Sequence, residues 1–382
     1  MKPCKKIVAL GLSGALLFAV PMNAAAEAKK PENMDEATWI RLQDNVLEYD
    51  EIRDLVENYN PTYLQVVGNI EANTVTFLEA AKELRNYADT MAADAKEIKD
   101  DNPFLYQAFQ GAADGYRKGA KKYEDAVDSV HNKSRNSLRQ VRDSVASGVQ
   151  MAVIGYYQAQ ASLEMVETAA ELSQAAYDSA VTQQTLGMAT STDVQAAEKA
   201  LQSAQGKLKN IQDSMTKVRQ QICNMTGWAY NADMQLGEVP QPDLARIDTM
   251  NPENDLFRAI GNNYTLIEQR SMSGKGDSNR NAKFRLIDET EAKVKIELET
   301  LYQSILEGRT AYEAAGTAFQ SAQITMNGND LKYQMGMLGR LEYLQAKMAY
   351  LQQKAAYRTA ALSLRQAMEN YDWAVAGLAD VK

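Results

Sequence analysis

The stretch LGMATSTDVQAAEKALQSAQ (residues 186–205) decides the fold, because a related stretch, QMGMLGRLEYLQAKMAYLQQ (residues 334–353), follows it later in the chain. At an offset of 149 positions, the matching pairs are Gly187 with Gly336, Met188 with Met337, Asp193 with Glu342 and Ala197 with Ala346. A period of this length indicates tandem duplication of a large unit and not a short-repeat solenoid. Each half of the chain is expected to carry one copy of the unit.

The first stretch has the signals of a turn between two helices. Gly187 is suited to the left-handed conformation that ends a helix. Ser191 or Thr192 can cap the helix that follows, and Thr190 stands just before them. Asp193 adds a carboxylate to the first turn of that helix, where the helix dipole favours negative charge.

The second stretch has the same plan with a weaker cap. Gly336 is the expected helix-ending residue, and Glu342 takes the place of Asp193. Gly339 and Arg340 replace the hydroxyl residues, so we expect this turn to be capped less strongly.

The flanking segments have the periodicity of packed helices. After the first turn, ten apolar residues alternate in steps of three and four: Val194, Ala197, Leu201, Ala204, Leu208, Ile211, Met215, Val218, Ile222 and Met225. Such spacing predicts a coiled-coil seam. After the second turn one stripe runs from Leu341 to Ala355 and another from Tyr343 to Ala367, so that helix should contact neighbours on two sides, as in a closed ring. The predicted fold class is all-α, with long antiparallel coiled-coil hairpins in two tandem repeats.

The N-terminus has the features of a secretory signal. Residues 1–26 combine three early lysines with the apolar run IVALGLSGALLFAV and the small residues of NAAAEA. The apolar run is shorter than the roughly 20 residues needed to span a bilayer, which disfavours a membrane anchor. Cys223 is then the single cysteine of the mature chain, and we expect it to be a buried small hydrophobe.

Charge and side-chain inventory exclude several functions. Removal of the three signal lysines takes the net charge from −9 to −12, which argues against nucleic acid as a partner. His131 is the only histidine and lies in a polar stretch typical of a solvated surface. The sequence has no Cys/His metal cluster, Gly-rich phosphate loop or nucleophile elbow. We therefore predict no enzyme activity, no metal site and no cofactor.

The remaining chain is predicted to be helix after helix. The expected division is a signal peptide (1–26), a first helical repeat (27–227), a linker (228–253) and a second helical repeat (254–382). The helices expected outside the duplicated stretches are 36–58, 61–100, 104–186, 256–272, a long helix to Asn327, and a last helix to Ala376.

Several motifs, in this order, resemble the TolC-type outer-membrane efflux proteins. In the first half they are YYQAQASLEMV from Tyr156, LGMATSTDVQAAEKAL from Leu186 and NMTGW from Asn224. The second half repeats them as LYQSILEGRTAYEAA from Leu301 and YQMGMLGRLEYLQAKMAYL from Tyr333. In addition, NYNPTYL at Asn58 and NNYTLI at Asn262 resemble the family's turn between its short equatorial helix and the next long helix.

This resemblance implies a homotrimer that forms a helical cylinder in the periplasm. It also implies that the helical tips dock on a periplasmic adaptor, which connects to an inner-membrane transporter. On this chain the implied docking residues are Gly187, Thr190, Ser191, Thr192, Asp193, Gly336, Gly339, Arg340 and Glu342.

One feature departs from the family. The family places two amphipathic strands per repeat between the paired helices, to build a β-barrel, whereas residues 99–103 and 271–283 are short, polar and non-alternating. We therefore expect a variant whose barrel strands are short or absent.

Two functions stay open for such a variant. It is either a component of an envelope efflux or export system or a non-transporting coiled-coil spacer of the cell envelope. In both cases the chain is expected beyond the cytoplasmic membrane, in the periplasm or associated with the outer membrane.

Overall fold

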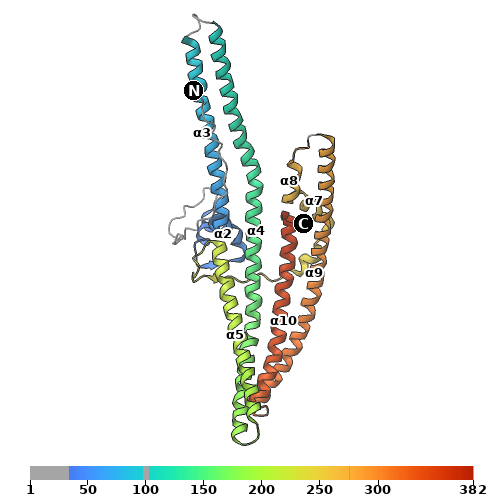
Figure 1. Cartoon of the computed structure of the whole chain (residues 1–382). Helices are drawn as coiled ribbons and strands as arrows, with labels where there is room; N and C mark the ends of the chain where they lie inside the picture. The colour runs from blue at the N-terminus through green and yellow to red at the C-terminus, as the bar shows by residue number, and fades with distance from the viewer. Residues whose placement is uncertain (1–33, 98–102, 275, 382) are drawn as a thin grey trace.

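The computed structural model describes residues 34–97, 103–274 and 276–381, and most of them are helical (Figure 1). The predicted signal peptide and most of the first polar connection, near residues 99–103, lie outside this part. Five long helices dominate: α3 (Pro61–Glu97), α4 (Pro103–Thr185), α5 (Ser191–Thr226), α9 (Asp277–Gln334) and α10 (Arg340–Trp373). The prediction of an all-α fold built from long antiparallel hairpins is confirmed.

Helix α4 is the longest helix, and α3, α5 and α10 all pack against it. It contains 83 residues without interruption, which corresponds to about 125 Å at 1.5 Å per residue. Helix α3 packs on its first part, α5 packs on its last part, and α10 packs between α4 and α9 (Figure 1). In the half that contains the duplicated turns, the helices therefore lie in the order α5, α4, α10, α9.

The predicted apolar seam matches the burial pattern. All ten seam residues of α5 are buried or half-buried. Between Val194 and Met215, all of the residues that do not belong to the seam are exposed. The two stripes of α10 are likewise buried or half-buried, because this helix contacts α4 on one side and α9 on the other. Cys223 is buried, as predicted, and burial raises the pKa of its thiol.

The duplication extends to the other end of each hairpin. We call these places the two junctions. In the first junction, the side chain of Asn60 accepts a hydrogen bond from the Tyr63 amide (2.8 Å) and donates one to the Met225 carbonyl (2.7 Å). Asn60 thus starts α3 and ties it to the end of α5.

The second junction repeats this arrangement. The side chain of Asn263 accepts from the Leu266 amide (3.0 Å) and donates to the carbonyls of Gly377 (3.5 Å) and Ala379 (3.4 Å). Both asparagines are buried. The motifs at Asn58 and Asn262 therefore occupy equivalent places in the two repeats.

The segment 36–58 is not the single helix that its sequence predicted. It forms α1 (Glu36–Arg41), strand β1 (Val46–Leu47), the 3-10 helix η1 (Tyr49–Glu51) and α2 (Ile52–Tyr59). Strand β1 pairs in parallel with β2 (Gln235–Leu236), with Val46 opposite Gln235 and Leu47 opposite Leu236. The helical prediction was wrong here because the strand depends on a partner far along the chain.

The second half differs from its prediction in its helix boundaries. The expected helix 256–272 is divided into α7 (Pro252–Asn262) and α8 (Tyr264–Ser271), because Asn263 adopts a non-helical conformation and caps α8. Helix α9 continues beyond Asn327 to Gln334, and α10 is followed by a π-helical turn, η2 (Ala374–Leu378).

Two apolar cores lie near the middle of the molecule. The first joins the N-terminal elements to α4 and α5, and its largest buried members include Leu47, Ile52, Ile154 and Ile222. The second joins α6 (Leu244–Thr249) to α10 and includes Ile247, Leu266, Leu298, Ile305 and Leu364. The predicted linker, 228–253, supplies Met234 and Val239 to the first core and Ile247 to the second. Among the helices that the structure describes, none is both long and apolar enough to cross a membrane.

Candidate docking tips

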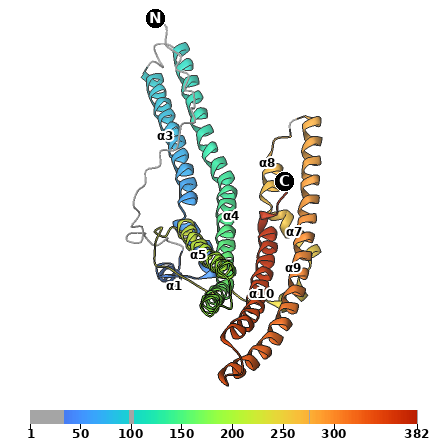
Figure 2. The same ribbon diagram turned by 60° about the horizontal axis from the view of Figure 1, so that its bottom comes forward.

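The two duplicated turns lie at the same end of the molecule. We call residues 186–193 the first tip and residues 335–342 the second tip. The first joins α4 to α5 and the second joins α9 to α10 (Figure 1). Figure 2, in which this end comes forward, shows both turns as free ends of their hairpins. The two tips thus lie at the same end of the molecule, away from the two cores.

Both tips end their first helix with the same backbone motif. In the first tip, the amide of Gly187 donates to the Gln184 carbonyl (2.9 Å) and the amide of Met188 donates to the Gln183 carbonyl (2.8 Å). In the second tip the corresponding bonds are Gly336 to Tyr333 (3.0 Å) and Met337 to Lys332 (2.8 Å). This is the Schellman arrangement, which requires a left-handed residue. The φ angles of Gly187 (+75°) and Gly336 (+72°) confirm the predicted role of both glycines.

The first tip restarts its helix with a complete capping box at Thr190. The Asp193 amide donates to Thr190 Oγ1 (3.3 Å), while the Thr190 amide and hydroxyl donate to Asp193 Oδ2 (2.8 and 2.7 Å). These bonds to Thr190 lower the pKa of the Asp193 carboxyl. The predicted cap at Ser191 or Thr192 was wrong by one or two positions, because α5 begins at Ser191 and its cap must precede it.

The second tip has half of such a box. The Gly339 amide donates to Glu342 Oε2 (3.2 Å), but Gly339 has no side chain to accept a bond in return. Instead, aromatic contacts close this tip. Tyr333 stacks on Tyr343 with ring centroids 4.1 Å apart, and the Tyr343 hydroxyl donates to Asp330 Oδ1 (3.0 Å).

All nine residues predicted from the resemblance are exposed at the tips: Gly187, Thr190, Ser191, Thr192, Asp193, Gly336, Gly339, Arg340 and Glu342. Six of them have a structural role in the turns: Gly187 and Gly336 end the first helices, and Thr190, Asp193, Gly339 and Glu342 form the caps. The side chains of Ser191, Thr192 and Arg340 are therefore the polar groups at the tips that are not used in capping.

The sequence analysis missed the apolar part of the tips. Four large side chains are strongly exposed there: Leu186 (68%), Met188 (75%), Met335 (65%) and Met337 (70%). They form two pairs at the offset of the duplication, and this repetition was the available signal. Methionine is flexible and polarisable and suits surfaces that adapt to a partner. The tips thus offer exposed apolar side chains next to polar groups.

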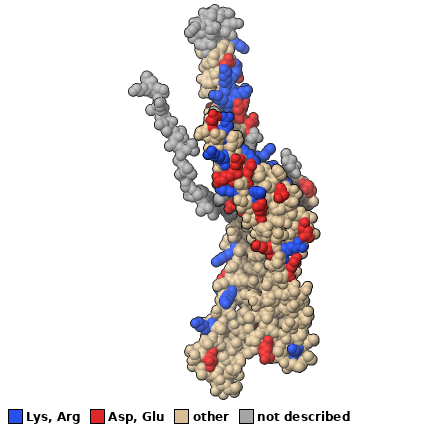
Figure 3. Space-filling view, turned by 90° about the vertical axis from the view of Figure 1, so that its right-hand side faces the viewer, with Lys and Arg blue, Asp and Glu red and all other residues tan. Residues whose placement is uncertain are grey.

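The charge on this end of the molecule is low. The first tip carries one charged residue, Asp193, and the second carries Arg340 and Glu342. On the face seen in Figure 3, Lys, Arg, Asp and Glu gather over the half that is remote from the tips, and few lie near them. A partner at the tips would therefore meet apolar side chains and backbone groups more than charge. In the described part of the chain, no group of His, Cys, Asp and Glu side chains is arranged to hold a metal ion.

Comparison with known proteins rests on structure. No family model matches the sequence, and no curated protein matches it significantly. A membrane protein from Pseudomonas aeruginosa is similar with a TM-score of 0.52 and 13% sequence identity, over 86% of this chain and 93% of that protein. The outer membrane protein VceC from Vibrio cholerae is similar with a TM-score of 0.50 and 10% identity, over 86% of this chain and 96% of VceC. The chain therefore has the fold of the TolC-type outer-membrane proteins, as its motifs predicted.

Proposed function

We propose that this chain forms the helical conduit of an efflux or export system in the cell envelope. In this proposal three copies form a ring, and the six tips dock on a periplasmic adaptor that connects to an inner-membrane transporter. The observation that supports docking is the placement of both tips at one end, with the same turn and the same exposed Leu and Met side chains. Such a repeated surface suits a partner that binds each tip in the same way.

The helices at the two edges of the row support the proposed ring. Helices α5 and α9 lie at the two edges of the order α5, α4, α10, α9 (Figure 1). Helix α9 exposes Ile296 (63%), Ile324 (74%) and Leu331 (59%). Apolar side chains of this size gain roughly 1.5–3 kcal/mol each when they are fully buried. Contact between α9 of one copy and α5 of the next would bury these side chains and close the ring.

Light scattering on the purified mature chain tests the ring. We expect a trimer at micromolar concentration, and we expect Ile296→Lys with Ile324→Lys to yield monomers. The control is Ile40→Lys, which changes a similarly exposed isoleucine (61%) on α1. A wild-type monomer with full helicity and a cooperative thermal transition would overturn the ring.

Site-specific photo-crosslinking in the source cells tests the docking. A photoreactive residue at position 188 or 337 should crosslink to an adaptor, whereas the same residue at Phe257, which is 82% exposed on α7, should not. Helicity and melting temperature should be unchanged in all three variants. Adaptor crosslinks that are absent at the tips, or equal at Phe257, would contradict docking. If export also proceeds without the tips, the alternative of a non-transporting envelope spacer is favoured.

A further inference from the structure

The first repeat extends further from the junctions than the second. Helix α3 contains 37 residues, which corresponds to about 55 Å at 1.5 Å per residue. In the second repeat, the side chain of Gln269 on α8 donates to the Thr290 hydroxyl on α9 (3.0 Å), and α9 starts at Asp277. The pair of α8 and α9 therefore reaches only about 30 Å beyond its junction. Figure 1 and Figure 2 both show the hairpin of α3 and α4 projecting beyond the start of α9.

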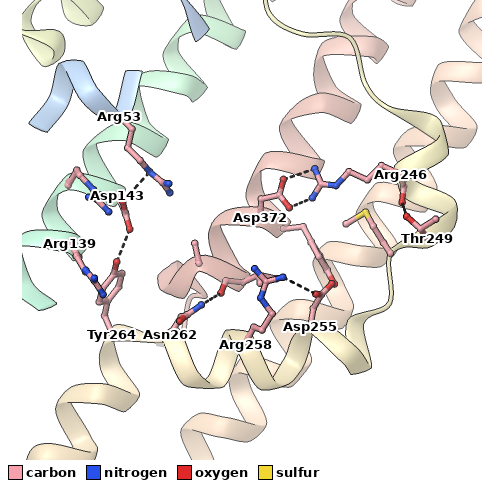
Figure 4. Close-up of a pocket in the computed structure, with 15 residues that line it drawn as sticks. Arg53, Arg139, Asp143, Arg246, Thr249, Asp255, Arg258, Asn262, Tyr264 and Asp372 are labelled. Atoms are coloured by element: carbon pink, nitrogen blue, oxygen red, sulfur yellow. Dashed lines mark hydrogen bonds and ion pairs between the residues drawn. The ribbon is translucent and has the colours of Figure 1, made fainter. Parts of the chain in front are cut away.

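The base of this projecting hairpin is tied to the second repeat. Asp143 on α4 accepts from the Tyr264 hydroxyl on α8 (2.7 Å) and lies 3.4 Å from Arg53 on α2 (Figure 4). Asp143 is buried. Helix α4 then continues without interruption from the tip, through this contact, into the projecting hairpin. In a ring of three copies, the three hairpins would thus extend from one ring, around one axis.

One face of the hairpin is uncharged and aromatic. Tyr87 on α3 lies beside Tyr116 on α4, with ring centroids 5.8 Å apart, and Phe77 lies beside Tyr123 at 6.0 Å. Small residues lie between these rings on the same side. We call this side the tyrosine face, and its members are Ala80, Tyr87, Ala112, Tyr116, Gly119 and Tyr123. Its tyrosines are partly exposed, by 56%, 36% and 39% in chain order.

The opposite face is charged. Arg85 precedes Tyr87 by two residues, and so it points away from Tyr87 by roughly 200° around the helix. Arg85 donates two hydrogen bonds of 2.9 Å to the Glu124 carboxylate, and Arg117 lies 3.9 Å from Asp89. We call this side the ion-pair face. Interfaces between proteins are enriched in aromatic residues and depleted of charged ones at their centres, so the tyrosine face is the better suited to contact another chain.

The outer edges of the two helices carry opposite charges beside the tyrosine face. The edge of α3 exposes Glu79 and Glu83, and the edge of α4 exposes Lys118 and Lys122, with Asp125 as one acidic residue after them. The contacts across the hairpin place Glu83 and Lys122 at about the same distance from the junctions. Neither forms an ion pair within the described part of the chain. Copies around a three-fold axis stand at the same level, so these edges are complementary between neighbours.

We propose that the three hairpins converge beyond the end of the second repeat, with their tyrosine faces turned toward the three-fold axis. The α3 edge of each copy then packs against the α4 edge of the next, and Glu83 of one copy lies beside Lys122 of its neighbour. This inference rests on the proposed ring and adds a second contact between its copies. The conduit would narrow from four helices per copy to two at the end remote from the tips.

Cysteine crosslinking tests which edges meet. The variant Glu83→Cys with Lys122→Cys is treated with a short bis-maleimide and analysed on a denaturing gel. We expect covalent trimers, because the two positions lie on opposite edges of one hairpin and can be linked only between copies. Either single variant should give no trimer. Cys223 is buried, so the introduced thiols are the accessible ones.

The matched control moves each cysteine by one residue. Lys82→Cys with Lys121→Cys places exposed thiols on the same two helices at the same level, but toward the ion-pair face. This pair should stay monomeric on the gel. All four positions are exposed, so we expect helicity to be retained.

Light scattering before crosslinking separates this inference from the ring itself. A trimer in solution that is not linked at positions 83 and 122, or that is linked equally well at 82 and 121, would overturn the convergence and leave the ring intact. A monomer in solution would overturn both. Trimers in solution that are linked at 83 and 122 alone would establish the proposed contact.

Discussion

The tips and the junctions both use glycine with a positive φ angle, but in different surroundings. Gly187 and Gly336 at the tips have φ angles of +75° and +72°, and Gly227 and Gly377 at the junctions have φ angles of +79° and +124°. At the tips, a Cβ atom would meet nothing within 4 Å. At the junctions, it would overlap the carbonyl oxygen of the residue before the capping asparagine. The first pair therefore serves only the turn, whereas the second pair also permits close packing of backbones.

The difference shows that tertiary packing constrains the junctions, whereas the tips are constrained only by hydrogen bonds within the turn. At the junctions, the ends of the hairpins pack against the starts of the next helices, beside buried Asn60 and Asn263. At the tips, backbone hydrogen bonds within the turn are sufficient, and the surrounding side chains stay exposed. Substitutions at the junctions should therefore affect folding, and substitutions at the tips should affect mainly the surface.

The largest effect is expected for Gly227→Ala and Gly377→Ala. Each combines an unfavourable positive φ angle with overlap of backbone atoms, and each should lower the free energy of unfolding by about 3 kcal/mol or more. Urea unfolding followed by circular dichroism measures this loss. A loss below about 1 kcal/mol at either position would show that the junction relaxes easily and would remove the contrast with the tips.

The next effect is expected for Asn60→Ala and Asn263→Ala. Each change removes a helix cap and leaves buried backbone groups without a partner, which should cost about 2–3 kcal/mol. The matched variants Asn60→Asp and Asn263→Asp keep the capping oxygen but remove the donor to the carbonyl. They should lose stability to an intermediate extent in the same unfolding measurement. Equal losses for Ala and Asp would assign the whole effect to the donor.

A smaller loss, about 1 kcal/mol, is expected for Gly187→Ala and Gly336→Ala. The left-handed conformation is unfavourable for alanine, but the space around each tip glycine is open. Gly206→Ala on α5 is the control, since this glycine is helical and also has open space. It should raise stability by roughly 0.5–1 kcal/mol. A loss at the tips as large as that at Gly227 would contradict the comparison.

The smallest effect is expected from the difference between the caps of the two tips. The two variants are Thr190→Gly in the first tip, which removes a capping side chain, and Gly339→Ser in the second, which adds one. Thr190→Gly should lower the free energy of unfolding by a few tenths of a kcal/mol, and Gly339→Ser should raise it by a similar amount. Differential scanning calorimetry of the two variants measures the change in melting temperature. If both variants changed the melting temperature in the same direction, Thr190 and Gly339 would not be equivalent cap positions.

The cap of the first tip should also depend on pH. Because hydrogen bonds lower the pKa of Asp193 below its ordinary value of 3.8, its contribution is present above pH 3.8 and is lost as the pH falls through the lowered value. The difference in melting temperature between the wild type and Asp193→Asn should therefore vanish in acid. A difference that persists there would mean that the Asp193 charge is not its cause.

Most of the tip geometry could be predicted from local signals. A glycine after an apolar helix and an acidic residue three places after the cap are both signals within one turn of chain, and both turns formed as expected. The cap itself was placed at Ser191 or Thr192 and not at Thr190, because three successive hydroxyl residues are equally suited and the preceding Schellman turn decides among them. The exposed methionines were missed because apolar residues near a seam are ordinarily assigned to the core.

The sequence by itself determined the hairpins, their duplication and the buried seams, because these depend on hydrogen bonds and apolar spacing within single helices. Only the tertiary structure decided the features that join distant segments. Strand β1 exists because it pairs with β2, and Asn45 reaches the carbonyl of Asp233, 188 residues away. The Tyr264 hydroxyl of the second repeat likewise donates a hydrogen bond to Asp143 of the first repeat, 121 residues away. No local pattern encodes such pairs, since their energy arises only after the two cores have packed and placed the segments side by side.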